Sequence, residues 1–508
     1  MAGPMLDVLV IGAGPTGLAA ALELARRDVA VRIIDAADRP FGGSRGKGVT
    51  ARTQEIFDDL GVIDDLERVG WRHQPRRVTV GGKVVSDSAP DAGAEPTPDR
   101  PYPSGLILPQ WRTEEILRNR LRESDIQVDY GVRAISADVV DDHVQVTTER
   151  DSLRARYVIG CDGGHSGVRE WIGARFDGHG GMQAMYVGDV EVAGLAPDRW
   201  YQWTDPTAGF AALCPFRDSA TWQFQGVQFA AFDNDGEFAE PSLDTLQQTL
   251  NAVTGERAIQ LSAPTWMSRW RVNVRLSDRF REGRMFLAGD AAHVHSPAGG
   301  LGMNTGIQDA YNLGWKLAAV LDGRADERLL ETYATERVPI AEWTLGVSTA
   351  GLEKMTAAMQ DSTATTLIPA TEDGQQLGLG YRWSSLSHQT DAYETRSGGV
   401  QAGDRAPDGR CTGPDGNIIR LFDAFRGTHA AVLGIGDAAE AAQALTLRVN
   451  VGHTRTVTSD IDQTRNIYCG SSTGGLYVVR PDGYIGFAGT ADDDGEAAAY
   501  LHLIGAAD

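Results

Sequence analysis

The sequence predicts an α/β protein in which a Rossmann-like dinucleotide-binding domain is joined to a β-sheet domain and a smaller C-terminal domain. Residues 6–35 show an apolar strand, a glycine-rich turn, an Ala/Leu-rich helix and a second strand, the order of a dinucleotide-binding unit. Residues 176–275 instead alternate apolar and polar side chains, as half-buried strands do. A chain of 508 residues is also too long for one hydrophobic core. We therefore expect domains at 1–175 (with part of the β-sheet domain near 76–105), 176–275, 276–395 and 396–508.

Amino-acid composition and net charge restrict the kind of protein this can be and the partners it can bind. Hydrophobic residues make up 42% and charged residues 23% of the chain, as in soluble globular proteins. The formal net charge of −22 has the wrong sign for binding nucleic acid or an anionic membrane. No run reaches the roughly 20 apolar residues of a membrane span, and the opening MAGPM has no basic region of a signal peptide, so we expect a cytoplasmic protein. The four cysteines form no C-x-x-C pair, which argues against a metal site.

The first candidate site is the glycine motif GAGPTG. Gly12 permits a tight turn, Gly14 lets the backbone approach a pyrophosphate, and Gly17 allows close packing of the helix on the strand. The N-terminus of that helix favours a diphosphate. Asp35, at the end of the second strand, can accept hydrogen bonds from a ribose. The motif alone does not distinguish FAD from NAD.

Two later strand ends carry the same kinds of residue. In CDGGHSGVR, Asp162 and Gly163 precede Arg169, a combination that can serve dinucleotide phosphates. In AGDAAHVHSPAGGLGMNTG, Asp290 can hydrogen-bond a second polyol, and the small residues 297–302 can lie against a flat ring. A helix is expected to follow from about Met303 or Asn304, and its N-terminus would favour an anionic ring.

In this order, the three motifs resemble the dinucleotide, DG and GD motifs of the single-component, class A FAD-dependent aromatic hydroxylases, over roughly residues 6 to 350. In that family the stretch SRGKGVTARTQEIFDDLGV brings an arginine near the FAD pyrophosphate, here Arg45, with Arg52 as a second candidate. The stretch LPQWRTEEILRNRL resembles the segment whose glutamine contacts FAD, here Gln110. The resemblance assigns the FAD contacts to Gly12, Gly14, Pro15, Thr16, Gly17, Asp35, Arg45, Gln110, Asp162, Gly163, Gly289, Asp290, Pro297, Gly300, Leu301, Gly302, Met303 and Asn304.

The resemblance also implies how the flavin lies. Asp290 binds the ribityl chain, the backbone of residues 299–304 lines the isoalloxazine edge, and Pro297 faces the ring where oxygen reacts. The sequence departs from the commonest family pattern at Ala298 and Leu301, where threonine and glutamine are frequent. No catalytic side chain is assigned beyond this flavin-facing loop, which comprises Pro297, Gly299 and Gly300.

The activity implied by the resemblance is that of an FAD-dependent NAD(P)H:oxygen oxidoreductase. It hydroxylates a phenolic or polycyclic, polyketide-like aromatic compound through a flavin C4a-hydroperoxide. Because no second G-x-G-x-x-G unit is present, NADPH or NADH would visit the FAD site transiently, with Asp162 and Arg169 as candidate contacts. Baeyer–Villiger or decarboxylative oxidation of a polyketide uses the same motifs, and a non-catalytic flavin- or ligand-binding protein is the alternative of another class. A flavin halogenase is disfavoured because no W-x-W-x-I-P motif occurs.

The β-sheet domain is predicted to bind the substrate, but its aromatic side chains are more often core than ligand contacts. They are Trp200, Trp203, Phe210, Trp222, Phe224 and Phe229. The open candidates for phenol activation are His73, Tyr201 and Arg217. We expect His293 to be a packing and hydrogen-bonding residue, and Asp309 and Lys316 to lie on a helix surface.

The sequence pattern changes again in the C-terminal part of the chain. HQTDAYETRSGG, residues 388–399, reads as a polar linker. The region after it resembles the thioredoxin-like domain of phenol-hydroxylase-type and polyketide-hydroxylase-type members. Because it lacks a C-x-x-C pair, it cannot perform dithiol chemistry, and a structural or oligomer-contact role is favoured. The oligomeric state stays open, with a homodimer as one option.

Overall fold

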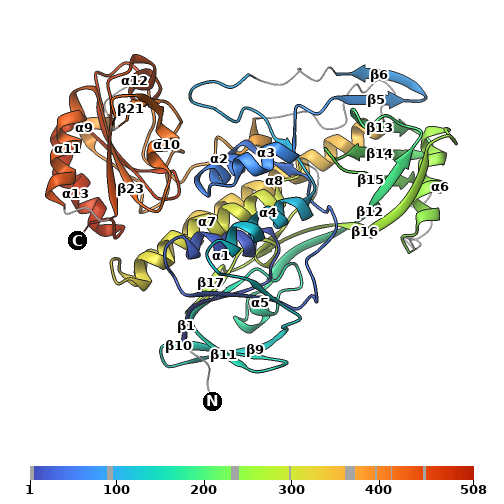
Figure 1. Ribbon diagram of the computed structural model, residues 1–508, viewed down its shortest axis with the longest axis horizontal. Helices are drawn as coiled ribbons and strands as arrows, with labels where there is room; N and C mark the ends of the chain where they lie inside the picture. Colours follow the sequence, from blue (N-terminus) through green and yellow to red (C-terminus); the bar gives the residue numbers. More distant parts are fainter. Residues whose placement is uncertain are drawn as a thin grey trace.

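The computed structural model describes residues 5–88, 95–229, 240–296, 299–360, 372–394, 398–413, 415–449 and 453–507. Pro297 and Ala298 lie outside these ranges, as do residues 395–397 of the predicted linker. Figure 1 shows the C-terminal domain on the left, a group of helices above a first sheet in the centre, and a second sheet on the right. Among the described residues, no helix is long and apolar enough to cross a membrane.

The first sheet forms the Rossmann-like domain that the sequence predicts. Its strands lie in the order β17-β18-β11-β1-β2-β8, and β1 runs parallel to both β2 and β11. The apolar run of β1 is buried over its last four residues, as expected for a parallel strand covered on both faces. The strands are β1 (Met5–Ile11), β2 (Val31–Asp35), β8 (Val128–Tyr130), β9 (Ala134–Val140), β10 (His143–Thr148), β11 (Ser152–Gly160), β17 (Arg281–Glu282) and β18 (Met285–Leu287).

Helices cover this sheet, and the central one is α7 (Gly302–Leu321). Helix α7 packs against α1 at a close distance, because a Cβ on Gly314 would lie 2.4 Å from Cγ of Glu23. The other helices of this layer are α1 (Pro15–Ala25), α2 (Ala51–Asp59), α3 (Ile63–Val69), α4 (Gln110–Arg122), α5 (Gly167–Trp171) and α8 (Glu331–Gln360). The short strands β3 (Gly48–Val49), β4 (Trp71–Arg72) and β7 (Leu106–Ile107) form a small sheet of their own.

Burial of α7 corrects one prediction. Asp309 and Lys316 do not lie on a helix surface, since both are 0% exposed. Helix α8 packs along α7 and supplies the opposite charges, Arg337 to Asp309 and Glu336 to Lys316, each at 2.7 Å. Charged residues can be buried on a helix when such partners are present.

The second sheet has the order β19-β16-β12-β15-β14-β13-β5-β6, in which the β13–β5 pair is parallel and the other pairs are antiparallel. Helix α6 (Leu243–Thr254) covers one face, where Trp222 and Phe224 are buried as core. Trp203 and Phe210 are buried too, whereas Trp200 is only half-buried. The strands are β5 (Arg76–Val80), β6 (Lys83–Asp87), β12 (Phe176–Ala193), β13 (Trp200–Asp205), β14 (Gly209–Pro215), β15 (Thr221–Gln228), β16 (Gln260–Ser277) and β19 (His293–Val294).

The C-terminal domain is a mixed sheet, ordered β20-β26-β25-β23-β24, with helices packed on it, the architecture expected of a thioredoxin-like domain. The strands are β20 (His388–Gln389), β21 (Arg410–Thr412), β22 (Ile418–Arg420), β23 (Ala430–Ile435), β24 (Thr454–Ser459), β25 (Gly475–Val479) and β26 (Ile485–Gly489). The helices are α9 (Asp391–Glu394), α10 (Leu421–Phe425), α11 (Ala439–Arg448), α12 (Asp462–Cys469) and α13 (Asp494–Leu503).

The structure corrects the prediction of a linker at 388–399. Its first residues form β20, which pairs with β26, and α9. Tyr393 is buried, and its hydroxyl donates to the Val400 carbonyl at 2.7 Å. An edge strand is held by its backbone hydrogen bonds, so it can be polar in sequence and still belong to a sheet.

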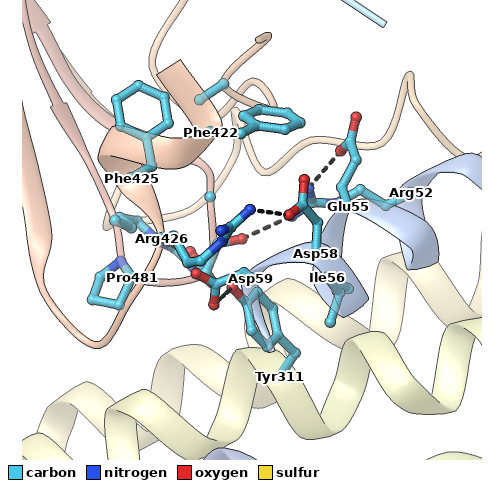
Figure 2. Close-up of a pocket in the computed structure, with 14 residues that line it drawn as sticks. Arg52, Glu55, Ile56, Asp58, Asp59, Tyr311, Phe422, Phe425, Arg426 and Pro481 are labelled. Atoms are coloured by element: carbon cyan, nitrogen blue, oxygen red, sulfur yellow. Dashed lines mark hydrogen bonds and ion pairs between the residues drawn. The ribbon is translucent and has the colours of Figure 1, made fainter. Parts of the chain in front are cut away.

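A charged contact surface joins the C-terminal domain to the helices. Figure 2 shows Arg426 reaching Asp58 of α2 across this contact, around a cavity of about 40 Å³. Arg52 is buried here as well, bonded to Glu55 at 2.8 Å and to the Asp482 carbonyl at 2.7 Å. A cavity of this size holds no more than a few waters. It is therefore too small for an aromatic substrate.

Candidate functional site

The glycine turn before α1 has the geometry of an anion site. Gly12 has φ +103°, and a Cβ there would lie 2.3 Å from the Cys161 carbonyl oxygen. A Cβ on Gly17 would lie 1.9 Å from the Gly12 carbonyl oxygen, so the helix can approach the strand only through a glycine. A Cβ on Gly14 would meet nothing within 4 Å, and no side chain caps α1. The first backbone N–H groups of α1 therefore face open space that fits a diphosphate.

Asp35 lies directly beside this turn. One carboxylate oxygen accepts from the Ala13 backbone N–H at 2.7 Å and the other from that of Ala37 at 2.8 Å. These hydrogen bonds fix the orientation of the carboxylate. Each oxygen can still accept another hydrogen bond, so the two oxygens can bind the two hydroxyl groups of a ribose.

The DG segment is built around Asp162. Its Oδ2 accepts from the backbone N–H groups of Gly167 and Val168 at 2.8 and 3.2 Å, and desolvation raises its pKa. Its Oδ1 is buried with no hydrogen-bond partner among the described residues. Gly163 has φ +82°, and a Cβ there would meet nothing within 4 Å. A polar ligand group therefore has both space and an acceptor here.

Arg169 is engaged within the protein. Its guanidinium donates to the carbonyls of Ala291 and Gly164, both at 2.9 Å, and lies 3.9 Å from the ring centre of Phe176. The side chain is 7% exposed. This geometry joins the DG and GD segments and favours a positioning role over a direct nucleotide contact.

Thr16 brings the first motif against the third. A Cβ on Gly289 would lie 2.5 Å from Oγ1 of Thr16, and one on Gly306 of α7 would lie 2.3 Å from the same oxygen. Both glycines are thus needed for the close approach of α1, the GD segment and α7. Asp290 follows at once and is solvent-accessible, although surrounding protein raises the pKa of its carboxyl by desolvation.

The charge of Arg45 acts on this carboxyl. Together with His293 it opposes the rise in the pKa of Asp290, which places Arg45 near the GD segment despite its distance in sequence. Its exposed guanidinium lies 5.3 Å from the ring centre of Phe41. Arg52, the second candidate, is instead committed to the contact with the C-terminal domain. The structure therefore favours Arg45 for the pyrophosphate.

Gln110 has protein partners at both ends of its amide. Its Oε1 accepts from the Gly46 backbone N–H at 3.0 Å, and its Nε2 donates to Glu114 at 2.9 Å. It therefore anchors the segment that carries Arg45.

The predicted flavin-facing loop is shaped by glycines and by Asn304. Gly299 and Gly300 have φ +99° and +67°, and Cβ atoms on Gly300 and Gly302 would meet nothing within 4 Å. The amide of Asn304 donates to the carbonyls of Gly48 and Gly300 at 2.9 and 2.8 Å and accepts from the Thr50 N–H at 2.9 Å. Asn304 thus holds the loop in place from behind.

Leu301 and Met303 complete the loop. Leu301 is 0% exposed and precedes α7, whose N-terminus has no side-chain cap. A Cβ on Gly46 would lie 3.4 Å from Sδ of Met303, so the segment carrying Arg45 runs alongside the start of α7. The uncapped helix start and the open glycine surface fit the edge of a flat, electron-accepting ring.

A buried network missed by the sequence analysis supports this site. Oδ2 of Asp309 lies 2.6 Å from Nε2 of His293 and accepts from the Gly289 N–H at 3.0 Å, while Oδ1 accepts from Arg337 at 2.7 Å. These bonds orient the backbone next to Asp290. His293 is fully buried and hydrogen-bonded, as predicted. The available signal for Asp309 was that it is the one acidic residue of α7.

The three candidates for phenol activation differ in position. Tyr201 stacks on Trp222 on the face covered by α6, and its hydroxyl donates to Asp198, so it faces away from the flavin loop. Nδ1 of His73 lies 3.2 Å from Oγ of Ser104, and Arg217 donates to the Gly70 carbonyl. The position of Tyr201 therefore counts against it, and His73 and Arg217 remain the open candidates.

Comparison with known proteins agrees with this geometry. Residues 5–348 match the FAD binding domain family, and residues 400–507 match the family described as aromatic-ring hydroxylase, C-terminal. A flavin-dependent monooxygenase of Mycobacteroides abscessus is 38% identical over 493 residues, covering 95% of this chain and 96% of that protein. Pentachlorophenol 4-monooxygenase of Sphingobium chlorophenolicum is 30% identical, covering 94% and 93%. The crystal structure of aklavinone-11 hydroxylase with FAD and aklavinone has a TM-score of 0.82 at 26% identity, covering 99% of each chain.

The fold and the site thus define an FAD-binding flavoprotein. The chain belongs to the family of FAD-dependent aromatic monooxygenases, whose members act on aromatic and polyketide compounds.

Proposed function

We propose that the protein uses NAD(P)H and O₂ to hydroxylate a phenolic or polycyclic, polyketide-like aromatic compound. The observation that carries the proposal is the convergence of three segments on one space. Thr16 holds the start of α1 against Gly289 and Gly306, so a diphosphate at α1, a ribityl chain at Asp290 and a ring at residues 299–304 can belong to one FAD molecule.

Each segment has its own part in binding. The N-terminus of α1 holds the diphosphate with Arg45, Asp35 binds the ribose, and Asp290 accepts from the ribityl hydroxyls. The start of α7 lies against the ring, where its partial positive charge stabilises negative charge. The proposed FAD contacts are Gly12, Gly14, Pro15, Thr16, Gly17, Asp35, Arg45, Gln110, Asp162, Gly163, Gly289, Asp290, Pro297, Gly300, Leu301, Gly302, Met303 and Asn304.

When bound, FAD supplies the redox chemistry, taking hydride from NAD(P)H and activating oxygen for transfer to the aromatic ring. The chain itself positions the substrate and excludes water. Helix α8 packs on strands β13 and β16 of the second sheet, which lies beside the helices in Figure 1, and this sheet is the proposed other wall of the site. Asp162 is the proposed NAD(P)H contact, with Arg169 holding its segment in place. We further propose that the protein acts in the cytoplasm.

Anaerobic stopped-flow absorbance tests this proposal. The holoprotein is mixed with NADPH or NADH, alone and with a panel of phenols and polycyclic aromatic compounds, and the flavin absorbance is followed. We expect one compound to accelerate bleaching and to be recovered with an added oxygen atom after aeration. A purified protein without FAD, or a flavin that neither nucleotide reduces, would refute the proposed function. A product with oxygen inserted between two carbons would replace hydroxylation by Baeyer–Villiger oxidation.

A further inference from the structure

A row of side chains crosses the second sheet on the face turned away from α6. In the strand register, Asp189 of β12 lies opposite Gln223 of β15, which lies opposite Cys214 of β14. Residues directly opposite each other share a face. A Cβ on Gly188 would lie 3.0 Å from Leu246 of α6, so its neighbour Asp189 faces the other way. We call Asp189, Gln223, Cys214 and Trp200 the polar row.

The polar row contacts the segment that carries Arg45. Nζ of Lys47 donates to Oε1 of Gln223 at 2.5 Å and lies 4.0 Å from the ring centre of Trp200. Nε2 of Gln223 donates in turn to the carbonyl of Ser44. One glutamine thus joins the sheet to both ends of this segment.

The other side of the same segment meets the flavin loop. The carbonyl of Gly48 accepts from Asn304 at 2.9 Å, and Gly46 lies next to Met303 at the start of α7. Lys47 stands between these two glycines. The polar row and the proposed flavin site are therefore neighbours, separated by a single strip of chain.

Several polar atoms of this region lack protein partners. The Asp189 side chain is 0% exposed. The hydroxyl and the backbone of Ser44 lie close enough to stabilise its carboxylate, but no group among the described residues makes a hydrogen bond of ordinary geometry to it. Within the part of the chain that the structure describes, Nε1 of Trp200 is buried without a partner as well. Burying a carboxylate unpaired is costly. Such a group is expected where a ligand completes its hydrogen bonds.

The electrostatics suit proton transfer. Burial raises the pKa of Asp189 to about 7, opposed by the nearby Ser44 and Lys47. Burial also lowers the pKa of Lys47 to about 8, with Arg76, Cys214 and Asp189 as the charged or titratable neighbours. A base works best when its pKa lies near the working pH. Lys47 and Asp189 attract each other, and no hydrogen bond joins them in the described part of the chain, so each keeps bonding capacity for a hydroxyl group.

Resting on the proposed hydroxylation, we infer that Asp189 and Lys47 bind and deprotonate a ring hydroxyl of the aromatic substrate. The O–H bond of the phenol breaks, its proton goes to the Asp189 carboxylate, and the electron pair stays on the phenolate oxygen. That oxygen pairs with the Lys47 ammonium, which Gln223 holds in position. The phenolate is the more electron-rich ring and so the better acceptor for hydroxyl transfer. The proton returns to solvent after turnover.

Quinizarin, a dihydroxyanthraquinone that is uncharged in neutral water and whose colour reports ionisation, is the probe for this inference. It is titrated into the oxidised holoenzyme near neutral pH, in the absence of NAD(P)H, and the phenolate band is recorded. We expect the wild type to bind it as the phenolate. Asp189→Asn and Lys47→Met should lose the band and bind about tenfold or more weakly. Lys47→Arg, which keeps the charge, should recover part of the band.

Glu191→Gln is the matched control, because Glu191 is exposed on the same strand β12. Glu191→Gln should bind the probe as the wild type does. Every variant should keep the flavin content and the thermal unfolding midpoint of the wild type. Quinizarin that binds as the neutral phenol, that keeps its phenolate band in Asp189→Asn, or that does not bind at all would overturn the inference. Stimulated NAD(P)H oxidation by any phenol would still stand as support for the proposed function, so the two failures are distinguishable.

Discussion

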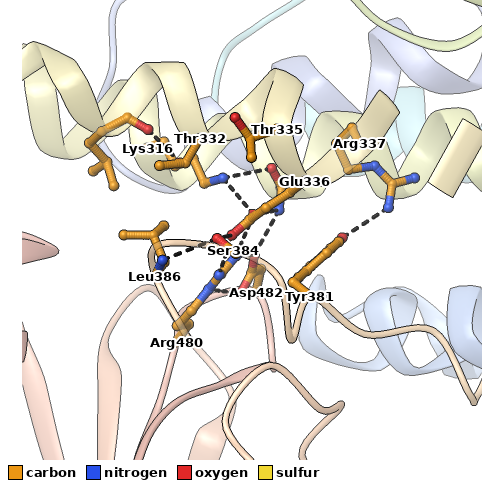
Figure 3. Close-up of polar contacts among 12 residues, drawn as sticks. Lys316, Thr332, Thr335, Glu336, Arg337, Tyr381, Ser384, Leu386, Arg480 and Asp482 are labelled. Atoms are coloured by element: carbon orange, nitrogen blue, oxygen red, sulfur yellow. Dashed lines mark hydrogen bonds and ion pairs between the residues drawn. The ribbon is translucent and has the colours of Figure 1, made fainter. Parts of the chain in front are cut away.

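Glu336 on α8 is the centre of a buried charge network, and its replacement by glutamine is predicted to destabilise the protein strongly. Its carboxylate accepts from Lys316 of α7 at 2.7 Å and from Arg480 of the C-terminal domain at 2.6 and 2.9 Å. Asn312 and Ser384 donate to it as well, at 2.8 and 2.7 Å. Figure 3 shows Glu336, Lys316, Ser384 and Arg480 meeting between the helices and the C-terminal domain.

The magnitude follows from what Glu336→Gln leaves behind. Lys316 and Arg480 are each 0% exposed, and only Arg480 keeps a carboxylate, that of Asp482 at 2.5 Å. Removing one partner of a buried ion pair costs about 3–5 kcal/mol. Each kcal/mol of lost stability lowers the melting temperature of a domain of about 150–250 residues by about 2–4 °C, so we expect the melting temperature to fall by about 6–20 °C.

The assay is thermal unfolding of the holoprotein followed by flavin and tryptophan fluorescence. Glu342→Gln on the same helix is the control, since Glu342 is exposed. The Arg480 and Lys316 charges hold the pKa of Glu336 well below its ordinary value despite its burial. Its stabilisation is therefore fully present above the ordinary glutamate pKa and is lost as pH falls towards the lowered one. A melting temperature within about 2 °C of the wild type, or a difference that widens in acid, would refute the reasoning.

Three further predictions concern the flavin site and the thiols. Gly12→Ala should purify with little FAD, because its Cβ would lie 2.3 Å from the Cys161 carbonyl oxygen, and a normal flavin absorbance after gel filtration would contradict this. Asp290→Ala should weaken FAD binding about tenfold to hundredfold by removing a charged acceptor. Equilibrium dialysis measures this, with the exposed Asp138→Ala as control, and equal FAD affinity would remove Asp290 from the site. Burial raises the pKa of Cys411 to about 11, so it should react with a disulfide reagent only after unfolding. Fast labelling of Cys411 in the native protein, located by mass spectrometry, would count against that burial.

The sequence by itself determined the parts of the protein that depend on short-range geometry. The spacing of Gly12, Gly14 and Gly17 specifies a turn and a helix start within a few residues, because each glycine answers a local steric demand. The DG and GD segments were predictable for the same reason, as strand ends marked by an acid and glycines. The glycine motif with its flanking strands was enough to predict the Rossmann-like domain, and the resemblance of the three motifs, in their order, to a known family predicted the flavoprotein class.

Only the tertiary structure decided which charges are buried and what they face. The sequence predicts Asp309 and Lys316 on a helix surface, but in the structure α8 supplies Arg337 and Glu336 as their buried partners. The sequence offers Arg52 as a candidate phosphate ligand, but in the structure its guanidinium donates a hydrogen bond to the C-terminal domain.

The same is true of the proximity of Asp189 and Lys47, which are far apart in sequence and come near each other where the second sheet packs on the segment carrying Arg45. A backbone turn is governed by its immediate neighbours. The free-energy cost of burying a charge depends on its partners, which can come from any part of the chain. The buried charges of the site were therefore determined by tertiary packing.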